Sequence, residues 1–201
     1  MKLYHLQNTR SVRPRWLLEE LGVPYECVRV ELWSGAGETP EYLAVHPLGA
    51  VPALEDGDLR LHESGAICAY LADKYPEKGF APPLGTPERA CYYQWLFYAV
   101  GTLEGPVMDY YAATVHTPEA ERVPADVDGA RRRFEEAAEV LERHMQGREW
   151  LLGAQFTAAD VMTISIIAWA RMMGLLAGFP ALEAYMKRGA ARPANKRARA
   201  D

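Results

Sequence analysis

Hydrophobic and polar positions change their spacing along the chain, and the change separates a first part with strands from a second part without them. Residues 2–6 form a short apolar and aromatic run that predicts a strand. Apolar residues at helical spacing follow over positions 16–21, and Gly22 is the expected helix stop. Residues 24–32 are rich in β-branched and aromatic side chains and indicate a second strand. A strand, a helix and a strand in this order predict a parallel pair with a right-handed crossover.

The next stretch predicts a short helix, a hairpin and a longer helix. Thr39 and Pro40 have the form of a helix start, with a capping residue followed by proline at the first helical position. Asp56 and Gly57 lie between two short strand-like runs, which is a strong hairpin signal because glycine tolerates positive φ. A helical pattern then begins near Ser64, its expected capping residue. Together these elements predict a four-stranded mixed sheet with helices on both faces, the thioredoxin-like arrangement.

Composition marks the end of this part. Four prolines and two glycines lie between Pro76 and Pro87, so we expect a linker there. Beyond it we expect only helices: an aromatic one that Gly105-Pro106 should interrupt, an amphipathic one that stops at Gly147, then a buried apolar one and a closing one. The predicted division is an α/β thioredoxin-like domain over residues 1–77, a Pro/Gly linker over 78–87 and an all-α domain over 88–201.

Composition and charge exclude several classes of protein. The 201 residues are 49% hydrophobic and 24% charged, an ordinary globular profile. The net charge of -5 gives no global attraction to nucleic acid, and no apolar run is long enough to span a membrane. Residues 187–201 carry a local charge of +5, which we expect to be a solvated end.

Cysteine usage points to a reducing compartment. Cys27, Cys68 and Cys91 are scattered, with neither a C-x-x-C pair nor the spacing of metal ligands. The N-terminus has no apolar segment of the secretory kind. We therefore expect a cytoplasmic protein without a metal site.

The loop after the first predicted strand carries the first candidate chemistry. The side chains of Asn8, Thr9, Arg10 and Ser11 can each donate a hydrogen bond. One interpretation is that they cap the following helix, and the other is that the loop holds an anion. These four residues alone do not decide between the two.

Three stretches in combination resemble the cytosolic glutathione transferases, especially the bacterial type. They are HPLGAVPALEDGDLRLHESGAICAYLADKY, RSVRPRWLLEELGVPYE and, in the helical part, WLLGAQFTAADV. The resemblance covers the whole chain. It implies an enzyme that conjugates the thiolate of glutathione, its co-substrate, to an apolar electrophile, and it implies a homodimer.

The resemblance also assigns residues to glutathione. The family's Val-Pro bond is cis, so at Val51-Pro52 the backbone N–H and C=O of Val51 should pair with the cysteinyl backbone of glutathione. Glu63 should hold the γ-glutamyl ammonium, and Ser64 with its helix N-terminus should hold the carboxylate. Without the resemblance, Ser64 is simply a helix cap. Asp160, in a capping-box pattern with a preceding threonine, is assigned to folding.

The resemblance gives the opening loop a task, which is to stabilise the glutathione thiolate. A free thiol has a pKa of about 8.5. One charge-assisted hydrogen bond is worth about 1.5–3 kcal/mol, which lowers that pKa by about one to two units. Family members with a catalytic serine would place it at Asn8 or Thr9, and those with a catalytic cysteine at Arg10; Tyr4 lies near the catalytic tyrosine of another branch. We favour Thr9 and Ser11 as hydroxyl donors, with Asn8 and Arg10 as alternatives.

The electrophile is expected between the two domains, where pockets prefer to form. Candidate walls are the aromatic residues of the first long helical segment: Tyr92, Tyr93, Trp95, Phe97, Tyr98, Tyr110 and Tyr111. Two alternatives stay open, a glutathione-dependent isomerase or disulfide reductase, and a non-catalytic relative that binds a protein partner. The missing C-x-x-C argues against a protein-disulfide oxidoreductase, and the glutathione motifs argue against a pure interaction module.

Overall fold

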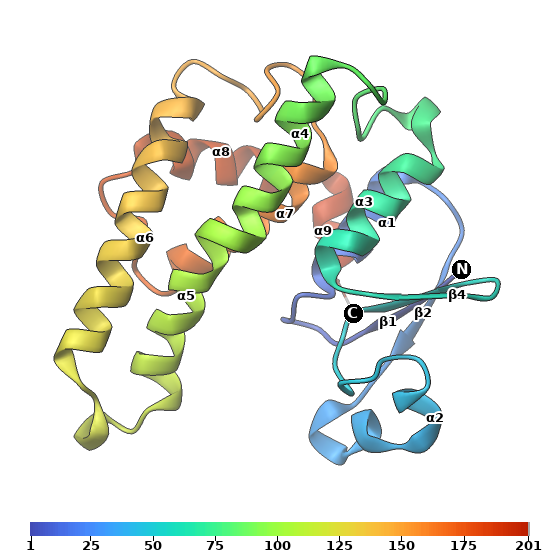
Figure 1. Ribbon diagram of the computed structural model, residues 1–201, viewed down its shortest axis with the longest axis horizontal. Helices are drawn as coiled ribbons and strands as arrows, with labels where there is room; N and C mark the ends of the chain where they lie inside the picture. Colours follow the sequence, from blue (N-terminus) through green and yellow to red (C-terminus); the bar gives the residue numbers. More distant parts are fainter. Residues whose placement is uncertain (201) are drawn as a thin grey trace. The chain divides into compact units, whose positions relative to one another are not determined.

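The computed structural model describes residues 1–200, and the chain divides into two compact units (Figure 1). The first unit is Met1–Ala81 together with the C-terminal residues from Ala190 onward, and the second is Pro82–Gly189. The boundary between Ala81 and Pro82 falls inside the expected linker. The division differs from the expected one at the C-terminus, because the last residues pack with the first unit instead of the helical one.

The first unit is built on a four-stranded mixed sheet with the strand order β2-β1-β3-β4. The strands are β1 (Lys2–His5), β2 (Glu26–Arg29), β3 (Ala53–Asp56) and β4 (Leu59–His62). β1 runs parallel to β2, as the crossover predicts, and antiparallel to β3, which forms the predicted hairpin with β4. Gly57 in the hairpin turn has a φ of 62°, a conformation that glycine adopts without strain. The thioredoxin-like prediction is confirmed.

Helices cover both faces of this sheet (Figure 1). Because side chains alternate along a strand, Leu3 and His5 point to one face and Tyr4 to the other. The first face packs against α1 (Val12–Leu21) and α3 (Ser64–Lys74), with Leu3 fully buried. On the second face Tyr4 lies against Tyr42 of α2 (Pro40–Leu43), with ring centroids 5.4 Å apart. Short 3-10 turns at Leu32–Ser34, Ala36–Glu38 and Pro76–Lys78 connect these elements.

The second unit is helical. Its elements are α4 (Pro87–Tyr98), a π-helical turn (Ala99–Leu103), α5 (Glu104–Tyr111), a second π turn (Ala112–His116), a 3-10 turn (Glu119–Glu121), α6 (Pro124–Met145), α7 (Ala158–Met172) and most of α8 (Pro180–Ala191). The predicted apolar helix is α7, in which every residue from Ala158 to Ile167 is buried. Among the described residues, no helix has both the length and the apolar character that crossing a membrane requires.

The expected interruption at Gly105-Pro106 takes the form of a π-helical turn. The turn spans Ala99–Leu103 and ends directly before α5, so that Pro106 falls in the first turn of that helix. Proline lacks the N–H that an α-helix interior needs, and its ring displaces the carbonyl of the preceding turn. A locally widened turn accommodates both effects without ending the helix.

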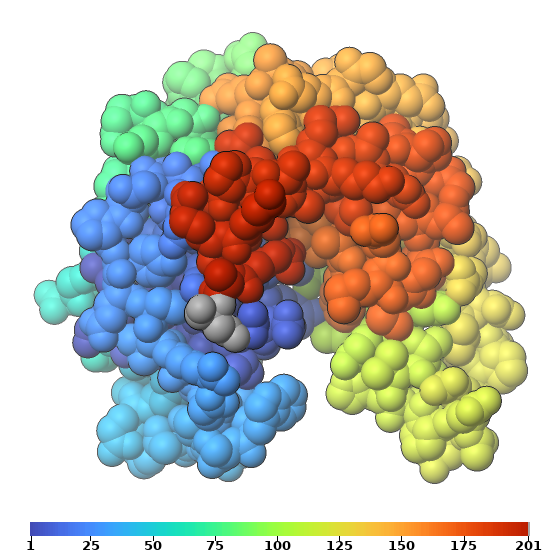
Figure 2. Space-filling view, turned by 180° about the vertical axis from the view of Figure 1, so that it is seen from behind, coloured from blue at the N-terminus to red at the C-terminus, as the bar shows by residue number. Residues whose placement is uncertain are grey.

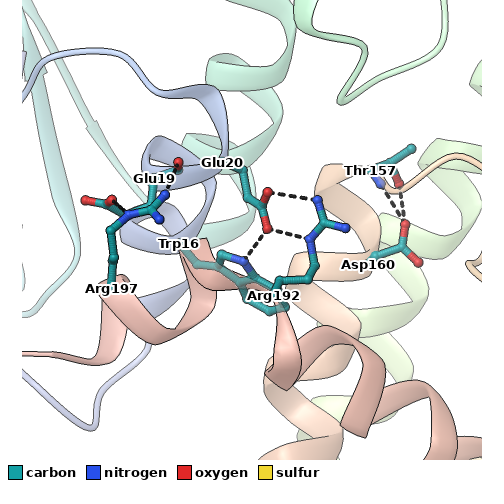
Figure 3. Close-up of polar contacts among 7 residues, drawn as sticks. All are labelled: Trp16, Glu19, Glu20, Thr157, Asp160, Arg192 and Arg197. Carbon is teal, nitrogen blue, oxygen red and sulfur yellow. Dashed lines mark hydrogen bonds and ion pairs between the residues drawn. The ribbon is translucent and has the colours of Figure 1, made fainter.

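Asp160 is buried and satisfies four donors at the start of α7. Its Oδ2 accepts from the backbone N–H of Thr157 at 2.8 Å and from the Thr157 hydroxyl at 2.9 Å (Figure 3). Its Oδ1 accepts from the Leu151 N–H at 2.9 Å and from the Tyr185 hydroxyl at 2.7 Å. Burial raises the pKa of Asp160 even though these hydrogen bonds oppose the shift. The carboxylate therefore joins a loop and two helices, which supports its assignment to folding.

The C-terminal helix α9 (Pro193–Arg199) packs against α1 within the first unit. Arg192, just before α9, makes a bidentate ion pair with Glu20: its Nε donates to Oε1 at 2.6 Å and its Nη2 donates to Oε2 at 2.8 Å. The Trp16 indole donates to the same carboxylate at 2.8 Å (Figure 3). Arg197 donates to the Glu19 side chain at 2.7 Å. We call these contacts of Arg192 and Arg197 with the two glutamates the C-terminal clasp.

The clasp corrects the expectation of a solvated basic end. Figure 2 shows the C-terminal helix, in dark red, lying over the blue N-terminal part of the first unit. Partial burial works against ionisation of Glu19, but the hydrogen bonds from Arg197 and Tyr25 outweigh it and lower the pKa of Glu19. Two of the six basic residues of the segment thus pair with acidic residues of α1, about 170 positions earlier in sequence.

We predict that Asp160→Ala lowers the free energy of unfolding by about 3 kcal/mol or more, because several buried donors lose their acceptor. Chemical denaturation monitored by circular dichroism measures this. A matched control is Glu183→Ala, which removes only an exposed pair with Lys187 and should change stability by less than about 0.5 kcal/mol. Equal effects of the two substitutions would contradict a structural role for Asp160.

Candidate functional site

The pairing register of the strands brings three loop segments to the same end of the sheet. Ala53 lies opposite Tyr4 on one side and opposite His62 on the other. The residues that follow β1, precede β3 and follow β4 must therefore all leave the sheet at the same end. These are the loop Asn8–Ser11, the dipeptide Val51-Pro52 and the pair Glu63-Ser64, the three segments that sequence analysis selected.

The opening loop holds its hydroxyl groups in a compact hydrogen-bonded set. The Thr9 hydroxyl donates to the Leu6 carbonyl at 2.7 Å and lies 2.8 Å from Ser11 Oγ. Ser11 Oγ also accepts from the Leu6 N–H at 3.1 Å and lies 2.7 Å from His5 Nδ1. Ser11 is fully buried, whereas Thr9 is half-buried and Asn8 and Arg10 are exposed.

The simple capping interpretation of this loop is incomplete. Ser11 occupies the N-cap position of α1 but has helical φ and ψ, and no side chain among residues 1–200 makes the capping hydrogen bond there. Instead Thr9 accepts from the Ser11 N–H at 3.2 Å, a local turn within the loop. Asn8 has a φ of 60°, a left-handed conformation that asparagine tolerates better than most residues. The loop is thus shaped by its own hydroxyls, and only Thr9 presents one near the surface.

Val51 and Pro52 lie beside this loop. The peptide bond between them is cis, as the resemblance implies. β3 enters the sheet register at Ala53, so within the described chain Val51 stands outside the strand ladder. Val51 is half-buried and Pro52 is buried. The arrangement offers the backbone of Val51 as a pairing partner for an extended, peptide-like ligand.

Glu63 and Ser64 share the N-terminus of α3 in an unexpected way. Glu63 is the N-cap residue and Ser64 the first helical residue, so the expectation that Ser64 caps the helix is wrong. In the described part of the chain no side chain caps this helix end, so its first N–H groups remain to be satisfied by another group. Glu63 has a φ of 70°, and a left-handed backbone at a non-glycine residue is typical of ligand-binding positions.

A buried arginine lies behind Ser64. Arg13 of α1 is 3% exposed, and its Nη1 donates to Ser64 Oγ at 3.1 Å. A guanidinium only donates, so the Ser64 oxygen accepts this bond and can direct its own proton elsewhere. Together with the uncapped N-terminus of α3, Arg13 makes this corner of the site favourable for a carboxylate.

Arg13, His5 and Arg15 are functional candidates that the sequence motifs did not indicate. Arg13 belongs to the same face of α1 as the buried Trp16 and Leu17. A charged residue inside an apolar stripe was the signal that could have found it, because such a charge must have a partner. His5 gave a similar signal, since it shares the core-facing parity of Leu3 in β1.

Other titratable groups at this end of the sheet are held neutral. Burial and a hydrogen bond to Glu55 at 2.9 Å raise the pKa of Tyr4 to about 12, which disfavours a phenolate there. His46 is buried and its ring lies 5.0 Å from that of His62, and burial followed by the neighbouring imidazole lowers the pKa of His46. Sequence analysis also missed this pair of histidines.

The cysteines do not contribute a nucleophile to the loop. Cys68 is fully buried, and burial raises the pKa of its thiol to about 12. Cys27 and Cys91 are exposed as residues, but neighbouring atoms still remove part of the water around the Cys27 thiol, and this desolvation raises its pKa. Among the described residues, no group of three or more His, Cys, Asp or Glu side chains is placed to hold a metal ion. The residues that the structure places at this end of the sheet offer hydrogen-bond donors, exposed backbone and a carboxylate.

Comparison with known proteins identifies the family. The glutathione S-transferase N-terminal domain matches residues 1–73, and the glutathione S-transferase C-terminal domain matches residues 124–188. Disulfide-bond oxidoreductase YfcG of Escherichia coli is 32% identical, with 98% of this chain and 93% of the relative covered. Glutathione S-transferase GstA, also of Escherichia coli, is 32% identical over 96% of this chain and 94% of its own.

Solved structures agree with this assignment. A glutathione transferase from Methylococcus capsulatus superimposes with a TM-score of 0.87 at 30% identity, covering 98% of this chain and 96% of its own. A glutathione transferase family member from Pseudomonas fluorescens, solved with two glutathione bound, gives a TM-score of 0.86 at 29% identity, covering 98% and 91%. The chain therefore belongs to the glutathione transferase family, and it is an enzyme that takes glutathione as its co-substrate.

Proposed function

We propose that this glutathione transferase conjugates the glutathione thiolate to an apolar electrophile. The observation that carries the proposal is the convergence of three segments at one sheet end, each suited to a different part of glutathione. The loop offers a hydroxyl donor at Thr9, Val51 offers its backbone, and Glu63-Ser64 offers a carboxylate and a helix N-terminus. In the transfer step the thiolate sulfur forms a bond to the electrophilic carbon, and the leaving group departs with the electron pair.

The γ-glutamyl end of glutathione carries a carboxylate and an ammonium side by side, and the α3 corner offers a partner for each. Ser64 can donate its proton to the ligand carboxylate because its oxygen already accepts from Arg13. The buried guanidinium and the helix N-terminus add positive potential there. Glu63 is exposed and provides the negative charge for the ammonium. The cysteinyl backbone then pairs with Val51 and places its thiol toward Thr9.

Thr9 is the proposed direct donor to the thiolate. It is the only one of the two favoured hydroxyl residues with surface to offer a ligand, since Ser11 is fully buried. We therefore assign Ser11 a supporting place behind Thr9, and we keep Asn8 and Arg10, both exposed, as alternative donors. A guanidinium at Arg10 would act as a charge near the thiolate or hold a carboxylate on the second substrate.

Disulfide reduction is a second candidate function. The observation that favours it is the similarity over nearly the whole chain to a protein named disulfide-bond oxidoreductase. A glutathione thiolate would attack one sulfur of a disulfide and release the other as a thiolate, and a second glutathione would then resolve the mixed disulfide into oxidised glutathione. The protein would need no cysteine of its own, which fits a loop that contains none.

Parallel assays separate the candidates. Turnover of a chloro-aromatic electrophile without reduction of a model disulfide supports transfer, and the reverse result supports reduction. Isomerisation of an activated double bond without net consumption of glutathione would indicate the isomerase alternative. Glutathione binding without turnover in any of these assays would indicate the non-catalytic, protein-binding alternative.

The aromatic residues expected to line the electrophile pocket differ in how far they are buried within the second unit. Tyr92, Trp95 and Tyr110 are buried in its core, so they are poor candidates for direct contact. Phe97 is 66% exposed, and Tyr93 lies beside it with ring centroids 6.5 Å apart. We propose that exposed members of this set, not the buried ones, contact apolar substrates or a second copy of the chain.

We also propose a cytoplasmic location, in keeping with the scattered thiols.

We predict that Ser64→Ala weakens glutathione binding by about 1–3 kcal/mol, the cost of losing a hydrogen bond to a charged group. Glu63→Gln should weaken it as well, because an uncharged amide replaces the partner of the ammonium. Isothermal titration calorimetry measures both. Glu77→Gln, a carboxylate in the 3-10 turn after α3, is the matched control and should leave the affinity unchanged. Unchanged affinity in both site variants would remove this corner from the glutathione site.

We predict that Thr9→Val raises the pKa of the bound glutathione thiol by about one to two units, because it removes the hydroxyl while keeping the shape of the side chain. Thr9→Ser, which keeps a hydroxyl, should stay close to the parent. Thiolate absorbance of the complex against pH measures the shift, and kcat/KM for the chloro-aromatic substrate should fall in parallel. A pKa that moves in Asn8→Ala or Arg10→Gln but not in Thr9→Val would transfer the role to those side chains.

We predict a homodimer with two-fold symmetry, the commonest oligomer and the arrangement that the family resemblance implies. Analytical ultracentrifugation at micromolar concentration should give twice the mass of the 22.5 kDa chain. Phe97→Glu places a charge at an exposed apolar position of α4 and tests whether this surface takes part. A single-chain mass for the parent protein would contradict the prediction.

A further inference from the structure

A continuous set of hydrogen bonds links the C-terminal segment to Thr9. Arg15 of α1 donates from Nη2 to the carbonyl of Ala200 at 2.8 Å, and its Nη1 lies 3.1 Å from His5 Nε2. The other ring nitrogen, His5 Nδ1, lies 2.7 Å from Ser11 Oγ, which lies 2.8 Å from Thr9 Oγ1. We call this set the Arg15–Thr9 chain. All its members belong to the first unit.

Arg15 fixes the direction of every bond in this chain. A guanidinium has donors and no acceptor, so His5 Nε2 must accept from Arg15 and carries no proton. A neutral imidazole with Nε2 unprotonated carries its proton on Nδ1. His5 Nδ1–H therefore donates to Ser11 Oγ. Glu19 lies near Arg15 and is held ionised by Arg197 and Tyr25, so it offsets the charge of the guanidinium.

This direction decides whether Thr9 is available to a ligand. Ser11 Oγ accepts from His5 Nδ1–H and from the Leu6 N–H at 3.1 Å, which fills both of its lone pairs. It therefore has no place for the Thr9 proton, which goes to the Leu6 carbonyl at 2.7 Å. That carbonyl also lies 3.0 Å from the Ser11 hydroxyl, so it keeps a donor when the Thr9 hydroxyl turns to a charged ligand.

The opposite tautomer of His5 would withdraw Thr9 from the ligand. With Nδ1 unprotonated, the Ser11 hydroxyl would donate to His5, and Ser11 Oγ would regain a lone pair. At 2.8 Å, Thr9 could then donate to Ser11 inside the loop. Hydroxyl protons rotate freely, whereas the guanidinium of Arg15 can only donate, so Arg15 favours the first of these two arrangements.

We propose that Arg15 is a positioning residue for the transfer reaction, holding His5 in its Nδ1–H tautomer so that Ser11 leaves the Thr9 hydroxyl free to donate to the glutathione thiolate. The proposal rests on the proposed function of Thr9. The C-terminal segment takes part because the Ala200 carbonyl holds the guanidinium, and Gln7 beside the loop donates to the Arg199 carbonyl at 3.0 Å. The C-terminal clasp keeps this segment against α1.

Arg15→Leu and Arg15→Lys test the proposal. Leucine keeps apolar bulk but cannot donate, so the pKa of the bound glutathione thiol should rise by about one unit, a tenfold lower thiolate-to-thiol ratio. Lysine also donates without accepting, so it should restore most of the parent value. The dissociation constant of glutathione should change less than about threefold in both variants, because neither residue contacts the ligand. Arg132→Gln, which removes an exposed pair with Glu136 in the second unit and touches no member of the Arg15–Thr9 chain, is the matched control.

The tautomer of His5 can be measured in the parent protein, so this test does not depend on whether a variant folds. Nitrogen-15 NMR of the parent protein, with the His5 resonances assigned by their loss in His5→Gln, should show Nδ1 protonated and Nε2 unprotonated. The reverse tautomer would overturn the proposal. A thiol pKa that moves in Thr9→Val but stays in Arg15→Leu would overturn it while leaving the role of Thr9 intact. An unshifted thiol pKa in the parent would overturn both.

Discussion

The antiparallel pairing of β1 with β3 is the constraint on which the rest of the site depends. Because Ala53 stands opposite both Tyr4 and His62, the loop after β1, the cis-proline dipeptide and the start of α3 leave the sheet at one end. A shift of this register by one residue would move Leu54 from the face that packs against α1 and α3 to the opposite face, so a fully buried side chain would lose its packing partners. Burial of apolar side chains thus fixes the position of the polar side chains that we propose as the glutathione site.

Buried polar groups gather behind this end of the sheet. His5, Ser11, Arg13 and Ser64 are each less than a tenth exposed, and hydrogen bonds join them in pairs across β1, α1 and α3. Leaving any of them without a partner would cost about 1–3 kcal/mol, so the pairs hold one another in a single arrangement. Donor-only guanidinium groups lie behind both serines: Arg13 contacts Ser64 directly, and Arg15 is linked to Ser11 through His5.

The C-terminal helix completes the first unit. Glu19 and Glu20 are adjacent on α1, and arginines about 170 positions later close on both of them. The ion pair of Arg192 with Glu20 is bidentate, and the Trp16 indole donates to the same carboxylate. It therefore fixes the position of the C-terminal segment on α1 better than a single exposed ion pair would. A segment that composition alone marks as a basic tail is thereby held against α1.

The sequence by itself determined whatever depends on neighbours in the chain. Helical spacing, the Asp56-Gly57 turn, the capping box at Thr157 and the family motifs were sufficient to predict the thioredoxin-like fold and to select the three segments that meet at one end of the sheet. Tertiary structure alone decided that Ser11 is buried while Thr9 is not, that Ser64 lies inside α3, and that the last helix docks on α1. The positions of Ser64 and of the last helix involve contacts between residues far apart in sequence, such as Arg13 with Ser64, 51 positions apart, and Arg15 with Ala200, 185 positions apart. No local pattern encodes such contacts, because their partners become neighbours only after the sheet and its covering helices have packed.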